Sequence, residues 1–314
     1  MRKRQGFALM AALWLIVIIG ATSYELSVRS RARRLAAANS LERIQGMAAA
    51  EGAIETVRAQ LEERLARPLQ VTVGTQVPDQ WSGLRAFRPD TITIGDERAM
   101  AIVRDGGALL QINRASEDDL RRLLAAIPLD AGLADQLAQR IMDWRDGDDQ
   151  RRARGAEREE YVRTGARRLP ANADFTSVAD LRDIEGMTPA LFARIGPYIT
   201  VRGTGQVNVN TAPGPVLYSL PGFGDEIVAT ILQNQRAGVP FRSLDDLNAR
   251  LSSGARASLL GASSELATRI TFETREILVE ATGWLAHSPV RVREEAMFVR
   301  AGDAIFTQWR RTEP

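Results

Sequence analysis

Acidic side chains gather in one stretch of this chain, and they are the residues best suited to chemistry. They alternate with other residues around a glycine turn, and a second acidic group follows a few residues later. Carboxylate oxygens in such a pattern are the ligands that a hard cation such as Ca²⁺ prefers. The spacing does not match an EF-hand loop, so we expect a structural metal that holds a long loop. The candidate ligands are Asp143, Asp146, Asp148 and Glu157, with Glu160 behind them.

A second interpretation of the same stretch needs no metal. Arginines are interleaved with the acids, and their guanidinium groups can neutralise the carboxylates as salt bridges on a solvated loop. These arginines are Arg151, Arg152, Arg154 and Arg158. The sequence leaves both interpretations open.

Catalytic groups are scarce in the rest of the chain. The sequence contains no cysteine, so disulfides and thiol chemistry are excluded. His287 is the only histidine and lies beside Pro289, in a predicted turn. A serine hydrolase would need a Gly-x-Ser-x-Gly elbow, which the sequence lacks. We therefore expect a protein that is not an enzyme.

One phrase, residues 220–224, resembles a helix-hairpin-helix motif, whose DNA-binding form cradles a phosphate on hairpin amides and a helix N-terminus. A membrane-anchored DNA receptor of the competence type uses a similar phrase and is the alternative function. Asp225 and Glu226 follow directly, where they would repel a phosphate and satisfy the helix dipole. We expect a structural hairpin and no nucleic-acid partner.

The N-terminus combines a short basic head, residues 1–6, with an apolar run over residues 7–24. As a helix this run is about 27 Å long, close to the hydrocarbon thickness of a bilayer. A secretory signal cleaved after the run and an uncleaved anchor are both conceivable. The third possibility rests on Gly6, the last residue of the head, which directly precedes Phe7 as in a prepilin leader. The junction resembles type IV pilins and pseudopilins, and this implies cleavage between Gly6 and Phe7 and N-methylation of Phe7.

Beyond the run the chain predicts one long helix over residues 7–68, because no proline occurs before Pro68 and apolar residues recur at helical spacing. Gly46 and Gly52 weaken this prediction locally. The whole chain carries a net charge of +2 and loses three basic residues with the head, so net charge favours neither nucleic acid nor a strongly acidic substrate as a partner.

The remaining chain alternates between strand and helix patterns. Short β-type runs occur between residues 70 and 112, among them one at 71–73, and Asp105-Gly106 is a hairpin signal. Longer runs, of which the first covers residues 269–285, occupy the C-terminus. Between them lies a helical region with an internal repeat, visible in the similar phrases that begin at Phe175 and Phe241.

This order predicts an α+β fold: a pilin-like long N-terminal helix, an antiparallel sheet, and a large all-α insert domain. The expected parts are a leader (1–6), the long helix (7–68, with 7–24 transmembrane), the sheet (69–112 and 269–314), and the insert (113–268, with repeated units 113–201 and 207–260).

The whole order resembles the minor pseudopilin K family of type II secretion. Its most specific phrases here lie at residues 141–146, 155–157, 186–191, 197–201 and 207–213. Members of that family sit at the tip of a short periplasmic pseudopilus, anchored in the inner membrane, with minor pseudopilins I, J and H as partners and a prepilin peptidase as processing enzyme. The resemblance also implies calcium on the acidic loop.

Ala11 departs from the pattern of most pilins, and the K family shares this departure. The fifth mature position is usually glutamate, and family K typically lacks it. A carboxylate in lipid is costly unless the amino terminus of a neighbouring subunit neutralises it. A subunit with nothing above it can lose this glutamate, so Ala11 is the expected mark of a tip subunit.

Overall fold

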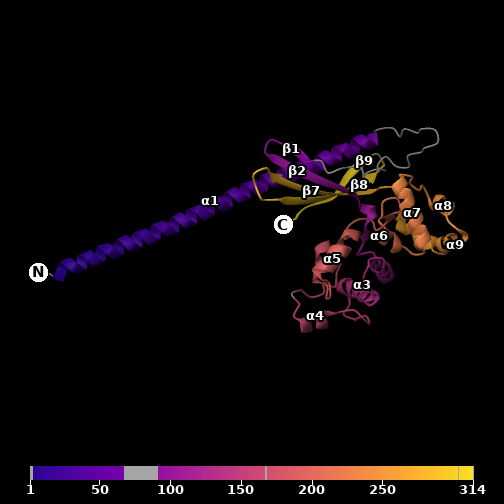
Figure 1. The fold of residues 1–314 in the computed structure, drawn as a ribbon, viewed down its shortest axis with the longest axis horizontal. Helices are drawn as coiled ribbons and strands as arrows, with labels where there is room; N and C mark the ends of the chain where they lie inside the picture. The colour runs from indigo at the N-terminus through magenta and orange to yellow at the C-terminus, as the bar shows by residue number, and fades with distance from the viewer. Residues whose placement is uncertain (1–2, 67–90, 167, 303, 314) are drawn as a thin grey trace.

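The structure is a computed structural model that describes residues 3–66, 91–166, 168–302 and 304–313. Its dominant element is α1 (Lys3–Ala66), one helix of 64 residues without a proline. Figure 1 shows the N-terminal part of α1 projecting alone and its C-terminal part lying along the sheet. The predicted strand at 71–73 and the predicted end of the long helix lie outside the described residues.

A five-stranded antiparallel sheet, ordered β1-β2-β7-β8-β9, receives the C-terminal part of α1. Every second residue of β7 is buried, as expected for a strand with one face against a helix. Its strands are β1 (Thr91–Ile94), β2 (Glu97–Asp105), β7 (Glu276–Leu285), β8 (Val292–Ala301) and β9 (Ala304–Glu313).

The contact between α1 and the sheet is apolar and very close at one point. The buried cluster includes Ile54 and Leu61 from the helix and Val279 and Phe298 from the sheet. The helix lies very close to β7 at Gly283, where a Cβ atom would lie 2.5 Å from the amide nitrogen of Ala50. A side chain at Gly283 would therefore collide with the backbone of α1.

A helical region lies between β2 and β7 in the sequence and has its own apolar core. Its first half contains η2 (Gly106–Ala108), β3 (Leu110–Gln111), α2 (Glu117–Ala125), α3 (Ala131–Arg145), α4 (Arg158–Thr164), η3 (Val178–Asp183), α5 (Pro189–Ile195), η4 (Gly196–Tyr198) and β4 (Ile199–Thr200). Its second half contains β5 (Val207–Asn208), α6 (Gly214–Tyr218), α7 (Asp225–Ala237), α8 (Leu244–Asn248), α9 (Ser253–Gly261), α10 (Ser263–Arg269) and β6 (Ile270–Thr271). The predicted fold class, an α+β fold with a pilin-like long helix and an antiparallel sheet, is confirmed. The insert is mainly helical but not all-α, because it contains the short strands β3, β4, β5 and β6.

The two halves of the insert share one plan. Each half is closed by a short parallel strand pair, β3 with β4 and β5 with β6. In each half an asparagine side chain binds both backbone groups of a distant phenylalanine. The Asn113 amide accepts from the Phe175 N–H at 2.9 Å and donates to its carbonyl at 3.0 Å. Asn210 and Phe241 make the same pair of bonds, both at 2.8 Å.

The predicted hairpin at Asp105-Gly106 is wrong. Asp105 instead caps the 3₁₀ turn η2, and its buried carboxylate joins the sheet to the insert. It accepts hydrogen bonds from Asn208 at 2.6 Å and from Thr211 and Thr274 at 2.8 Å. These partners are about a hundred or more residues away, so a local turn signal could not reveal them. Burial raises the pKa of Asp105 above its ordinary value.

The predicted strand over residues 269–285 is divided in the structure. Ile270 and Thr271 form β6 and pair with β5 inside the insert, whereas β7 of the large sheet begins at Glu276. The division follows from the parallel pairing that closes the second half of the insert. The prediction of a strand at residues 270–271 is therefore confirmed, but this strand pairs with β5 and not with the large sheet.

Candidate metal centre

The acidic loop is an addition to the shared plan of the insert. In the first half, residues 146–174 join the end of α3 to the clamped Phe175, whereas residues 238–240 make the same connection to Phe241 in the second half. The second half closes its plan without such a loop. The first half therefore carries an extra segment, which contains α4 and the acidic residues, between these two points.

Helix ends fix the positions of the acidic side chains. Asp143 lies in the last turn of α3, and Asp146 is the residue that ends this helix. Asp148 follows in the turn, where it accepts a hydrogen bond from the Gln150 N–H at 2.8 Å. Glu157 is the N-cap residue of α4, and Glu160 lies in its first turn.

Gly155 allows the returning loop to touch α3. A Cβ atom at this position would overlap the Asp143 carboxylate, which is fully buried. The same carboxylate accepts a hydrogen bond from the Arg152 N–H at 3.2 Å. The contact of Gly155 with Asp143 and the hydrogen bond to the Asp143 carboxylate therefore hold the loop against α3. They bring the neighbouring Glu157 close to the end of α3.

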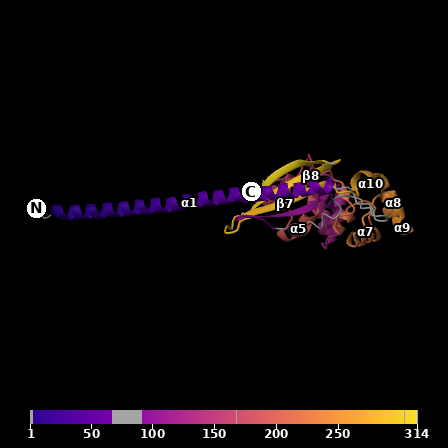
Figure 2. The ribbon, with the colours of Figure 1, turned by 90° about the horizontal axis from the view of Figure 1, so that it is seen from above.

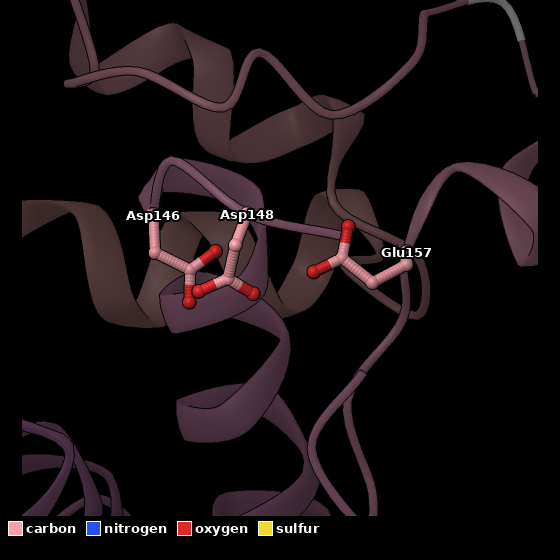
Figure 3. A group of neighbouring side chains, drawn as sticks. All are labelled: Asp146, Asp148 and Glu157. Atoms are coloured by element: carbon pink, nitrogen blue, oxygen red, sulfur yellow. The ribbon is translucent and has the colours of Figure 1, made fainter. Parts of the chain in front are cut away.

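Three of the five predicted ligands converge. Figure 3 shows the carboxylates of Asp146 and Asp148 side by side, with the Glu157 carboxylate facing them from the returning chain. One oxygen from each lies within 4.8 Å of the others. Glu157 is only 4% exposed. Both of its carboxylate oxygens, and Oδ1 of Asp146, are buried without a hydrogen-bond partner among the described residues.

Such an arrangement of carboxylates is electrostatically unfavourable by itself. Burial raises the pKa of Glu157 to about 7, and the nearby charges of Asp143, Asp146, Asp149 and Asp148 add to this effect. Buried acceptors without donors carry a desolvation cost that a cation would remove. The group therefore has both the geometry and the unmet charge of a cation site.

The other two predicted ligands are engaged by arginines beside this group. Arg152 binds Asp143 Oδ1 at 2.6 Å and also binds Oδ2 of Asp146, so it holds one side of the Asp146 carboxylate. Glu160 pairs with Arg151 at 3.2 Å. Arginines thus engage Asp143, Glu160 and one side of Asp146, as the second interpretation predicts, and the metal interpretation stays a prediction for Asp146, Asp148 and Glu157. The sequence pattern alone could not show which acids the arginines engage.

The donor set of the group fits a hard divalent cation. All three groups offer oxygen, and the loop geometry is irregular, which Ca²⁺ tolerates better than Mg²⁺ does. Asp146 Oδ1, Asp148 and both oxygens of Glu157 would hold the ion, with Asp143 and Arg152 supporting Asp146 from behind. A bound cation would join the end of α3 to the start of α4.

The residues predicted at the leader junction all lie on α1. Gly6, Phe7 and Ala11 fall within its first turns. From Ala12 onward, α1 is long and apolar enough to cross a membrane. Its large apolar side chains are exposed in this stretch, for example Trp14 at 65% and Ile16 at 69%.

Residues 220–224 form a turn between α6 and α7, and the two acids that follow this turn bind protein groups. Glu226 accepts hydrogen bonds from the Ser252 N–H at 2.7 Å and from its hydroxyl at 2.6 Å. Asp225 accepts from the Tyr218 hydroxyl at 2.9 Å. Two carboxylates therefore occupy the helix start where a DNA phosphate would have to bind.

Family comparisons give consistent results over the insert and beyond. Two models of the family "Type II secretion system (T2SS), protein K" match residues 99–204 and 207–269. Type II secretion system protein K of Klebsiella pneumoniae is 30% identical over 224 residues, covering 67% of each chain. The protein of that name from Pseudomonas aeruginosa is 26% identical over 268 residues, covering 80% of this chain and 78% of its own length.

A solved structure shares the fold. A chain in the crystal structure of the GspK–GspI–GspJ complex from the enterotoxigenic Escherichia coli type 2 secretion system superposes with a TM-score of 0.61. The match covers 91% of this chain and 99% of that one, at 16% sequence identity. At this identity the match concerns the fold alone.

Proposed function

This chain belongs to the type II secretion system protein K family, and from that premise we propose that it is a minor pseudopilin at the tip of the secretion pseudopilus. There it would initiate or cap assembly and so support protein export across the outer membrane, without catalysing a reaction. The observation that carries this proposal is the combination of family membership with a helix whose apolar half is free while its other half lies on a sheet.

The exposed half of α1 supports membrane anchoring. We propose that the chain crosses the inner membrane once, with the sheet and the insert on the periplasmic side. A prepilin peptidase would remove residues 1–6 and leave Phe7 as the methylated terminus. Exposure of these apolar side chains to water is unfavourable, whereas the hydrocarbon of a lipid bilayer accommodates them.

Partner contacts fit the part of α1 between the membrane and the sheet. Leu41 and Ile44 are 57% and 58% exposed, and by helical geometry they lie on the side away from the sheet. Helices that lie side by side bury such apolar side chains against each other. We propose minor pseudopilins I, J and H as the partners, a proposal supported by the fold match to a chain that is solved with GspI and GspJ.

Processing at Gly6 gives the direct test. We expect mass spectrometry of membrane-extracted protein to find a chain that starts at methylated Phe7. A bulky Gly6→Val change is expected to leave the chain starting at Met1 and to reduce secretion to the level of a deletion. Gly20→Val is the matched control, since Gly20 also lies on α1 and is open to its surroundings. A wild-type chain that starts near residue 22 would contradict the proposal.

Ala11 provides a test of the tip position. We expect Ala11→Glu to reduce secretion at least several-fold, because a tip subunit has no neighbour above it whose amino terminus could pair with the new carboxylate. Ala11→Gln, which has the same length but no charge, is expected to cause less damage. Normal secretion by the Ala11→Glu strain, with the variant incorporated along the fibre, would contradict a tip-specific role for this residue.

We propose that Ca²⁺ is the structural cofactor of Asp146, Asp148 and Glu157. The unpaired buried oxygens of Glu157 support this proposal, as does the raised pKa that a cation would lower. The metal would rigidify the loop on the insert and take no part in chemistry.

A further inference from the structure

Four arginines surround α1 directly after its apolar stretch, and we call them the arginine belt: Arg29, Arg31, Arg33 and Arg34. All four are exposed. Glu25 is the only acid of α1 before Glu42, and it pairs with Arg29 at 2.5 Å. Among the described residues no ion pair engages the other three arginines, so the belt keeps a net positive charge.

The belt is not confined to one side of the helix. At about 100° per residue, Arg29 and Arg33 share one side, while Arg31 and Arg34 share a side roughly opposite. A single protein partner would contact one face of α1. Charges distributed around the axis match a surrounding that is the same in all directions, which is what the headgroup layer of a bilayer provides.

The distance from the apolar run matches that layer. The run ends at Tyr24, so at about 1.5 Å per residue Arg29 and Arg34 lie roughly 7 and 15 Å beyond it. Side chains on a helix tilt toward its N-terminus, which here is the membrane side, and long arginine side chains extend back to the interface. Figure 2 shows this part of α1 separate from the sheet and the insert, so the belt is accessible from all sides.

We propose that the arginine belt binds the phosphates of anionic phospholipids in the leaflet nearest the sheet and thereby fixes the depth of α1 in the membrane. The inference rests on the proposed function, which has α1 cross the membrane. It assigns to the belt a ligand of its own, distinct from the pseudopilin contacts proposed further along the helix.

Lipid selectivity of the full-length protein tests this inference. The chain would be reconstituted in phosphatidylcholine vesicles containing spin-labelled phosphatidylglycerol or spin-labelled phosphatidylcholine. Electron paramagnetic resonance then reports the lipid immobilised on the protein. We expect immobilised phosphatidylglycerol to exceed phosphatidylcholine by about threefold at low salt, and the excess to shrink at 0.5 M NaCl.

The decisive variant is R29Q/R31Q/R33Q/R34Q, in which glutamine preserves helix propensity. It is expected to lose at least half of the excess, while the total immobilised lipid stays unchanged. The control R158Q/R163Q/R236Q/R275Q removes four exposed arginines of the insert and the segment before β7 and should keep the wild-type excess. All proteins share the same N-terminus, so the comparison isolates the belt.

The outcomes separate this inference from the proposed function. Immobilised lipid with an unchanged excess in the belt variant would overturn the inference and leave the arginines to a protein partner. An equal loss in both variants would also overturn it, because the effect would then follow net charge alone. An absence of immobilised lipid around the wild-type protein would overturn the membrane span itself, and the inference with it.

Discussion

Replacement of Gly283 by alanine is expected to destabilise the packing of α1 on the sheet by about 3 kcal/mol, the upper end of the usual cost of overpacking. The added Cβ atom would overlap the Gly46 carbonyl oxygen and lie 2.5 Å from the Ala50 amide nitrogen. Both neighbours are backbone atoms of a rigid helix, so no side chain can rotate away. The helix must move off β7 and weaken contacts of the buried cluster, such as those of Ile54.

Urea unfolding of the detergent-extracted protein, followed by tryptophan fluorescence, measures this effect. Gly52→Ala is the matched control. Gly52 lies on α1, the helix that packs against Gly283, and an added Cβ there would have nothing within 4 Å. It is expected to be neutral or to stabilise by up to about 1 kcal/mol through helix propensity. Equal stability of Gly283→Ala and wild type would mean that α1 is not seated on β7 as described.

The long helix and the sheet could be predicted from sequence because their signals are local. The absence of proline before residue 68 and the alternation in β7 require no knowledge of the rest of the fold. Gly46 looked like a weakness of the helix, and only the structure shows that it faces Gly283. Contacts between residues so far apart in sequence leave no trace in local periodicity.

The same distinction explains the candidate site. Residue type and spacing selected five acids, but the division between arginine and cation depends on which oxygens each group can reach. Arg152 takes Asp143 and one side of Asp146 because Gly155 lets the returning loop touch α3. Glu157 is left without a partner among the described residues for either oxygen. The difference between the unpartnered Glu157 and the arginine-paired Glu160 therefore arises from tertiary contacts.

Calcium is expected to stabilise the wild-type protein and to do so increasingly as pH rises from 5 to 8. Without metal, the Glu157 pKa of about 7 exceeds its ordinary value of 4.5. A raised folded-state pKa gives stability that is fully present below about pH 4.5 and is lost as pH rises through 7. The loss is on the order of 3 kcal/mol. A bound cation stabilises the ionised carboxylate, so saturating Ca²⁺ should remove this loss.

Urea unfolding at several pH values, in EDTA and in Ca²⁺, tests this expectation. Glu157→Gln should flatten the pH dependence in EDTA and abolish the calcium effect, which in wild type reaches about 2.7 kcal/mol when Ca²⁺ is a hundredfold above its Kd. Glu159→Gln, two residues away on the exposed side of α4, is expected to behave like wild type. A Glu157→Gln variant that keeps the full calcium response would remove Glu157 from the site. A wild-type protein that responds to pH but not to calcium would show that Arg152 and water stabilise these carboxylates, so that the loop holds its conformation without a metal.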